Sequence, residues 1–146
     1  MRLDDGFSTI VEFDELPGLK MYEKTVTPPG VNAGGAIDTT TMRNTDVRTK
    51  SPKQLIDFSD MSLTVAYDTG IYANDQIIAV CGVNQLITIT LPDGGTYEFW
   101  GWIDQFTPGE LSEGNQPTAT MTIILSNQDA TDDNAEIKPV YTAPTP

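Results

Sequence analysis

The chain has 146 residues, 38% of them hydrophobic and 20% charged, a balance typical of a single globular domain rather than a disordered segment. Twenty-one acidic against eight basic side chains give a net charge of −13, which excludes nucleic-acid recognition through a basic patch. The absence of histidine removes the commonest general base and the commonest transition-metal ligand.

No apolar stretch reaches the roughly 18 residues that a membrane-spanning helix needs. The opening "MRLDDGFSTI" places two aspartates before any apolar run, so it is not expected to be a signal peptide. We therefore expect no membrane partner.

Alternation of apolar and polar residues predicts β-strands in chain order. The expected strands cover residues 6–13, 19–26, 61–67, 87–91, 96–103 and 118–125. Their apolar faces carry Phe7, Val11 and Phe13; Met61, Leu63, Val65 and Tyr67; Ile87, Ile89 and Leu91; and Ala119, Met121, Ile123 and Leu125. The glycines of Asp93-Gly94-Gly95 predict a hairpin turn, because glycine tolerates the positive φ angles of such turns.

Residues 27–54 form a long polar stretch between two of these strands, with neither a helical nor an alternating period. Unstructured connections longer than about 12–15 residues are uncommon in compact domains and are usually functional or disordered. Four of the eight basic residues lie here: Arg43, Arg48, Lys50 and Lys53. The rest of the chain is therefore more acidic than the total indicates.

One short helix is expected over Tyr72–Gly82, where Ile77, Ile78 and Cys81 recur at helical spacing and Gly82 provides a stop. Cys81 has no second cysteine to pair with, and we expect it to be a small buried side chain. Residues 127–146 are acidic and rich in proline and threonine, which favours a mobile or loosely docked tail.

The second faces of the strands are rich in threonine, as in Thr88 and Thr90 or Thr118, Thr120 and Thr122. Such a face suits a wet but crowded surface, such as a barrel interior or a subunit contact. It also suits the simple preference of threonine for strands. The sequence does not separate the two interpretations.

Few motifs indicate chemistry. Asp68-Thr69-Gly70 follows an apolar strand, as the catalytic turn of aspartic proteases does, but the supporting strand that should follow is missing, and an ordinary turn is the simpler interpretation. The acids of 129–136 lack the ligand alternation and closing glutamate of a calcium loop. "GVNAGGAIDTT" lacks the Gly-Lys-Ser/Thr of a phosphate loop. We expect no catalytic residue, no metal and no cofactor.

Trp100 and Trp102 are two residues apart on one expected strand and share a face. If that face is exposed, it forms an aromatic patch for a protein partner or, less commonly, for a sugar. Ordinary packing beneath the helix or the long loop is the third interpretation.

Taken together, "YEKTVTPPGVNAGGAIDTTTMRN", "VRTKSPKQLIDFSDMSLTVAYD", "LPDGGTYEFWGWIDQFTPGE" and "EGNQPTATMTIILS" resemble the major tail tube protein of long-tailed bacteriophages. The resemblance covers roughly residues 5–126, and the whole arrangement is more specific than any one segment. It implies a mainly β domain over residues 1–126, of two packed β-sheets in a sandwich or half-barrel with one flanking helix, and a separate tail over 127–146.

The resemblance also implies a function in the virion tail. Subunits made in the host cytoplasm would form hexameric rings that stack into a tube, meet the tape measure protein and the tail terminator or tip proteins, and let DNA pass without specific binding. Residues 27–54 would be the loop that reaches a neighbouring subunit or the next ring, through Pro28, Pro29, Gly30, Thr39, Thr40, Met42, Arg43, Arg48, Lys50 and Lys53. Glu12, Glu23, Glu98 and Asp104 are the candidate acids of an electronegative lumen.

Three alternatives remain at this stage. A type VI-like secretion tube would share the architecture. A β-sandwich carbohydrate-binding module would use Trp100 and Trp102, and a homodimeric aspartic protease would use Asp68.

Overall fold

The computed structural model of the chain describes residues 9–15, 23–67 and 73–144. These residues form thirteen strands and one helix, so the expected mainly β fold with one short helix is confirmed. In chain order the elements are β1 (Ile10–Phe13), β2 (Glu23–Thr27), β3 (Val31–Asn32), β4 (Ala36–Asp38), β5 (Lys50–Pro52), β6 (Asp57–Phe58), β7 (Met61–Ala66), α1 (Ala73–Val80), β8 (Gln85–Thr90), β9 (Thr96–Pro108), β10 (Thr118–Leu125), β11 (Gln128–Asp129), β12 (Ala135–Glu136) and β13 (Val140–Thr142).

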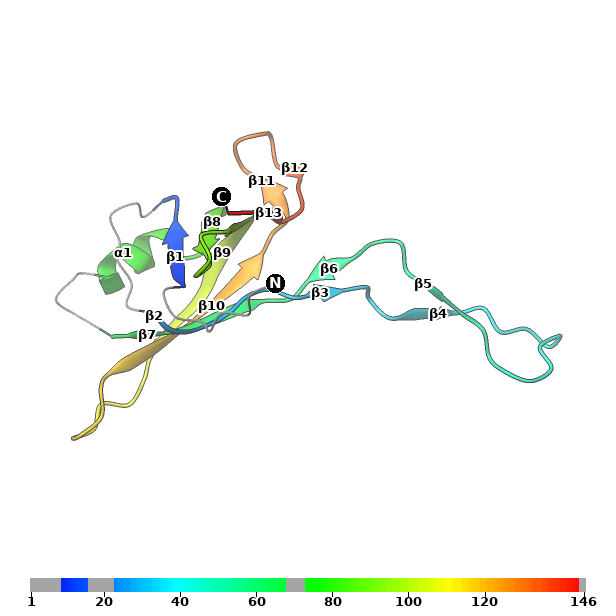
Figure 1. Cartoon of the computed structure of the whole chain (residues 1–146), viewed down its shortest axis with the longest axis horizontal. Helices are drawn as coiled ribbons and strands as arrows, with labels where there is room; N and C mark the ends of the chain where they lie inside the picture. Colours follow the sequence, from blue (N-terminus) through cyan, green and yellow to red (C-terminus); the bar gives the residue numbers. More distant parts are fainter. Residues whose placement is uncertain (1–8, 16–22, 68–72, 145–146) are drawn as a thin grey trace.

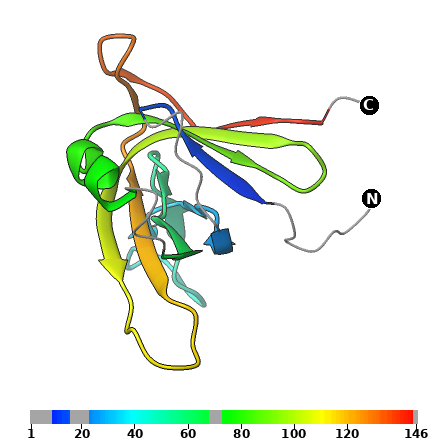
Figure 2. The same ribbon diagram turned by 90° about the vertical axis from the view of Figure 1, so that its left-hand side faces the viewer.

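Seven strands form one antiparallel sheet in the order β1-β8-β9-β10-β7-β2, with β13 paired to β9. The 13-residue β9 belongs to two halves of this sheet, because its first part pairs with β8 and β13 and its second part with β10. Figure 2 shows the two halves running in different directions and meeting where β9 bends. The two packed sheets expected from the sequence are thus two halves of one curled sheet.

The bend in β9 has two local causes. The pairing with β10 shifts register where Ile123 lies opposite Ile103 and Thr122 opposite Gln105, so Asp104 is the extra residue of a β-bulge. Nearby, a Cβ atom on Gly101 would lie 2.5 Å from the carbonyl oxygen of Ile124. Only glycine allows this close approach of two backbones.

The core lies on the concave face of the curled sheet. The predicted alternation is confirmed, because Val11, Phe13, Met61, Leu63, Val65, Ile87, Ile89, Phe99, Ile103, Ala119, Met121, Ile123 and Leu125 are all buried in one cluster. Phe7, predicted on the same face, lies outside the described residues.

A side chain joins the two ends of the sheet. Glu23 on β2 accepts a hydrogen bond from the amide of Val11 on β1, with 3.1 Å between Oε1 and N. Because β1 and β2 are the first and last strands of the sheet order, this bond closes the curl into a half-barrel around the core.

The helix covers one side of this core, and α1 contacts β9. Ile77 is buried as predicted, whereas Ile78 is 66% exposed and Cys81 is also exposed, so the expectation of a buried Cys81 is wrong. The helix ends at Val80, and Gly82, with φ of 81°, donates a hydrogen bond to the carbonyl of Ile103. This turn carries Cys81 to the surface before another helical turn could bury it.

The predicted hairpin turn between β8 and β9 is confirmed. Leu91 accepts a hydrogen bond from Gly94 at 3.0 Å and donates one to Gly95 at 2.8 Å. Gly94 adopts φ of 92°, which a side chain would strain.

The segment after Ser126 differs from a loosely docked tail. It forms a small hairpin of β11 and β12, and then β13 pairs with β9 from Val140 opposite Glu98 to Thr142 opposite Thr96. The pairing of β10 with β9 begins only at Gly101, so the edge of β9 before this residue is open to β13.

Candidate assembly interface

Residues 28–60, here called the arm, leave the body between β2 and β7 and project far from it (Figure 1). Most of this segment was expected to be an unpatterned loop, but it is an extended antiparallel hairpin. β3 pairs with β6 near the body, and β4 pairs with β5 farther out. These pairs are two and three residues long and are defined by main-chain register. Because such short pairs need no repeating pattern of apolar residues, the sequence did not indicate them.

The root of the arm is fixed to the end of the sheet. β2 ends at Thr27, and the following Pro28 and Pro29 lack the amide hydrogen that would continue a ladder. Beyond them, Gly30 and Ser59 exchange two hydrogen bonds of 2.8 Å, from the Gly30 amide to Ser59 Oγ and from the Ser59 amide to the Gly30 carbonyl. The arm therefore starts in one defined direction.

Between the two strand pairs, the arm has a break. Gly34 and Gly35 have φ angles of 83° and 90°, and the amide of Gly34 donates to Asn32 Oδ1 at 2.7 Å. Two consecutive residues of positive φ interrupt the ladder and set the angle between the inner and outer pairs.

The tip of the arm is built from threonines and one asparagine. Thr39 donates its amide to the carbonyl of Thr49 at 3.0 Å, and the Thr49 amide donates to Thr40 Oγ1 at 3.0 Å. Asn44 closes the end, because Oδ1 accepts from the amide of Thr41 at 3.1 Å and Nδ2 donates to the carbonyl of Val47 at 3.0 Å. Thr39 and Thr40, named from the sequence as assembly residues, serve here to hold the tip.

The arm exposes apolar side chains over its whole length. Met42 at the tip is fully exposed, and Val47, Leu55 and Val31 are 72%, 83% and 68% exposed. A two-stranded hairpin with exposed apolar residues is marginally stable by itself in water. The arm thus presents surface that nothing in the described part of the same chain covers.

The outer part of the arm carries net charge of the opposite sign to the rest of the chain, whereas Asp57 and Asp60 near its root make the whole arm neutral. Residues 27–54 have four basic and two acidic side chains, a net charge of +2, so the rest of the chain carries −13 − 2 = −15. Arg48 lies 3.4 Å from Asp38, with side chains 77% and 56% exposed, a surface pair worth at most about 1 kcal/mol. Arg43, Lys50 and Lys53 have no ion pair within the described residues.

A second projection is the loop 109–117 between β9 and β10. Its turn is held by Asn115, which donates its amide to the carbonyl of Ser112 at 3.3 Å and its Nδ2 to Ser112 Oγ at 2.9 Å. Glu110 and Glu113 are exposed, and Leu111 between them is 69% exposed. The sequence interpretation did not single out this loop, although an exposed leucine in the Gly/Pro-rich "PGELSEGNQP" was a usable signal.

The convex face of the sheet is rich in hydroxyl groups. In the half formed by β2, β7 and β10, cross-strand register places Thr25 and Thr120 opposite Thr64, and Thr27 and Thr122 opposite Ser62. We call Thr25, Thr27, Ser62, Thr64, Thr118, Thr120 and Thr122 the hydroxyl face. All seven are exposed or half-buried.

The four candidate lumen acids do not share one place. Glu12 and Glu98 flank Thr88 in one cross-strand row on the convex face of the other half. Glu23 is instead engaged with the Val11 amide, and Asp104 lies at the bulge of β9. Only Glu12 and Glu98 are thus brought together.

The tryptophan pair does not form an exposed platform. Trp100 is only 9% exposed, and Trp102 is half-buried. Sugar stacking needs an open aromatic face, so the basis for a carbohydrate-binding module is removed.

The described residues were also compared with the requirements of a metal site and of a membrane span. They contain no group of three or more metal-ligating side chains, and α1 is not long and apolar enough to cross a membrane. Asp68-Thr69-Gly70 lies outside the described residues.

Comparison with known proteins relates the whole architecture to tail particles. No family model and no curated protein matches the sequence. Among solved structures, the chain is similar to one from the tail of an empty gene transfer agent particle, refined with C6 symmetry, with a TM-score of 0.66 and 12% identity over 97% of this chain and 100% of that chain. A chain of the native gene transfer agent virion gives a TM-score of 0.64 and 13% identity over the same shares.

A third similar structure belongs to the baseplate of the anti-feeding prophage. The TM-score is 0.61 at 9% identity, over 92% of this chain and 91% of that one. The resemblance to phage tail proteins noted in the sequence is therefore confirmed at the level of the fold.

Proposed function

We propose that this chain is a non-enzymatic structural subunit of a phage-like tail tube, in which copies form hexameric rings that stack along one axis. The observation that carries this proposal is the match of 97% of this chain to 100% of a chain from a tail particle, with a TM-score of 0.66. The C6 symmetry of that particle supports six subunits per ring.

The arm supports self-assembly independently of this match. It exposes apolar residues, and Arg43, Lys50 and Lys53 have no ion pair among the residues that the structure describes. The chain outside residues 27–54 carries −15, so a second copy offers complementary charge. Contact with a neighbour would cover Met42 and Val47 and stabilise a hairpin that is marginal by itself. In this proposal Pro28, Pro29 and Gly30 direct the arm out of the body, and Arg43, Arg48, Lys50 and Lys53 supply its charge.

The convex face is proposed as the wall of the lumen. Its hydroxyl face carries no charge, and Glu12 and Glu98 add negative charge beside it. Lys and Arg would hold DNA through phosphate contacts. The cross-strand pairs of this face contain neither, and exposed Lys24, at the register shift of β2, is the basic side chain beside it. Six copies would bring 6 × 13 = 78 net negative charges to a ring, only part of them facing inward.

Tape measure, terminator and tip proteins would be the other tail partners of a virion subunit made in the host cytoplasm.

Negative-stain electron microscopy of concentrated protein, with light scattering of a fresh sample, tests the proposal. Hollow tubes or stacked rings of uniform width are expected. A protein that remains monomeric at high concentration, and also when seeded with preformed tail tips, would contradict it.

A second function, a subunit of a baseplate rather than of the length of a tube, is favoured by the likeness to a chain of the anti-feeding prophage baseplate. Antibody labelling of purified native particles separates the two functions. Label along the whole tail indicates a tube subunit, and label at one end alone indicates a baseplate subunit.

A further inference from the structure

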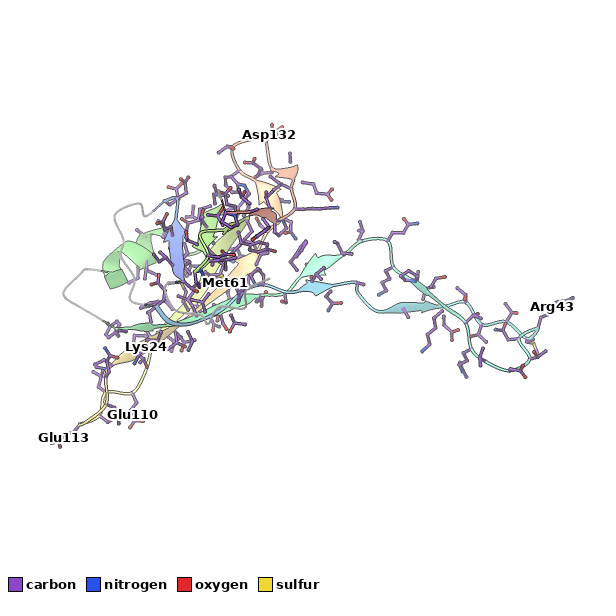
Figure 3. The ribbon with its side chains drawn as sticks, viewed as in Figure 1. Lys24, Arg43, Met61, Glu110, Glu113 and Asp132 are labelled. Carbon is purple, nitrogen blue, oxygen red and sulfur yellow. The ribbon has the colours of Figure 1, made fainter. Side chains whose placement is uncertain are left out.

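The two projections of the molecule lie at its opposite ends. Figure 3 places Arg43 at the tip of the arm and Glu113 at the far end of the other projection, the loop 109–117. The two loops therefore mark the two ends of the long axis along which Figure 1 is drawn.

The two ends are complementary in chemistry. The arm tip exposes Met42 and Val47 beside Arg43 and Arg48. The loop 109–117 exposes Leu111 between Glu110 and Glu113. Both ends thus combine exposed apolar surface with charge. The arm tip has two arginines and one exposed aspartate, Asp46, whereas the charged side chains of the loop 109–117 are both acidic.

We propose that the arm tip of one copy docks on the loop 109–117 of another copy, with Arg43 and Arg48 against Glu110 and Glu113 and with Met42 or Val47 against Leu111. This inference rests on the proposed tube and names the partner surface within it. A contact between two different surfaces, repeated by the same displacement, produces an open head-to-tail series rather than a closed pair.

The other acidic projection fits the arm less well. The loop 130–134 between β11 and β12 has Asp132 and Asp133 but no large apolar side chain. Asp129 at its start already accepts two hydrogen bonds from Thr131, at 2.9 and 2.6 Å. Asp132 also projects to the side of the long axis rather than at its end (Figure 3).

Charge reversal tests the pairing. Tubes are separated from free subunits by sedimentation and counted by negative stain. Glu110→Lys with Glu113→Lys is expected to lower the fraction of subunits in tubes at least about tenfold, because like charges would then face each other. Arg43→Glu with Arg48→Glu is expected to do the same, and Arg43→Glu alone, which keeps the Arg48–Asp38 pair, is expected to give a smaller loss in the same direction.

Rescue distinguishes docking from a general charge effect. The variant with all four reversals restores opposite signs, as does a mixture of the two double variants, and both are expected to recover tubes. Asp132→Lys with Asp133→Lys makes the same change in net charge on the other loop and is the matched control, expected to assemble as the unchanged protein does. All six side chains are on exposed loops, so circular dichroism should show unaltered folding.

Three other results would contradict either the docking pair or the proposed tube. If the unchanged protein forms tubes and the Glu110/Glu113 variant forms them equally well, the docking pair is wrong and the tube proposal stands. If both double variants fail and the fourfold variant does not recover, the pairing is also wrong. If the unchanged protein forms no tubes, the proposed function and this inference fall together.

Discussion

The carboxylate of Glu23 lies 3.1 Å from the amide nitrogen of Val11, and this hydrogen bond joins the first and last strands of the curled sheet. Val11 is buried in the core, so the bond satisfies a backbone donor at the place where no further strand is paired. A side chain that the sequence suggested for a lumen is thus part of the closure of the subunit.

Replacing Glu23 by Ala is expected to lower the free energy of unfolding by about 1–3 kcal/mol, because the Val11 amide loses its charged acceptor. Urea unfolding followed by tryptophan fluorescence measures this loss. Glu23→Gln keeps an acceptor oxygen and is the matched control, expected to lose less. Equal stability of all three proteins would show that the bond does not stabilise the half-barrel.

Replacing Gly101 by Ala is expected to destabilise the subunit by roughly 1–3 kcal/mol, because its Cβ would lie 2.5 Å from the Ile124 carbonyl oxygen. Thr120→Ala, at an exposed position on the neighbouring strand, is the control and should change stability little. Thermal unfolding of both variants checks the difference. A Gly101→Ala protein as stable as the control would mean that β9 can move away from β10 without cost.

Replacing Met42 by Gln is expected to reduce tube formation while changing the free energy of unfolding by less than about 0.5 kcal/mol, because the side chain is fully exposed in the subunit. Sedimentation of tubes and urea unfolding of the monomer measure the two effects separately. A loss of monomer stability that accounts for the loss of tubes would contradict a role of Met42 in contact between copies.

The pKa of Asp38 is expected to lie below its ordinary value of 3.8, because the side chain and then the backbone amide of Thr40 donate hydrogen bonds to the carboxylate. The hydrogen bonds from Thr40 to the ionised Asp38 carboxylate therefore contribute fully above pH 3.8. Their contribution is lost as the pH falls through the lowered pKa. Titration followed by NMR should show this lowered pKa, and Thr40→Ala should return it toward 3.8. An unchanged titration in that variant would exclude the Thr40 side chain as the larger cause.

Replacing Thr120 and Thr122 by Lys is expected to make assembled tubes retain short DNA, and added salt should release it, because lysines on the hydroxyl face would contact phosphates. Thr120→Ser with Thr122→Ser keeps the hydroxyls and should retain none. Filter retention of labelled oligonucleotides makes the measurement. No retention by a lysine variant that still forms tubes would show that the hydroxyl face does not line the lumen.

Most of the body could be predicted from the sequence because its strands alternate strictly. Met121 and Ile123 are buried while Thr120 and Thr122 are not, and the same period holds in β7 and β8. The register at Asp104 could not be predicted, because a bulge depends on the partner strand and not on local pattern.

The arm and the C-terminal strand were missed for a different reason. Their pairs are only two or three residues long and are joined by backbone groups, which any residue other than proline provides. Val140 and Tyr141 remain about half exposed even after β13 pairs, so no buried face marked this strand in advance. The role of Glu23 depends on contact between strands at the two ends of the sheet order, which is a property of the closed fold alone.

The long β9 has a consequence for how the subunit unfolds. Because this one strand pairs with β8 and β13 in its first part and with β10 in its second part, it is common to both halves of the sheet and couples them. The body should therefore open as one cooperative unit, with the amides of β9 among the last to exchange with solvent, while the arm exchanges early through local opening. Subunits can thus have a completely folded body while the arm remains free to adjust to its neighbour.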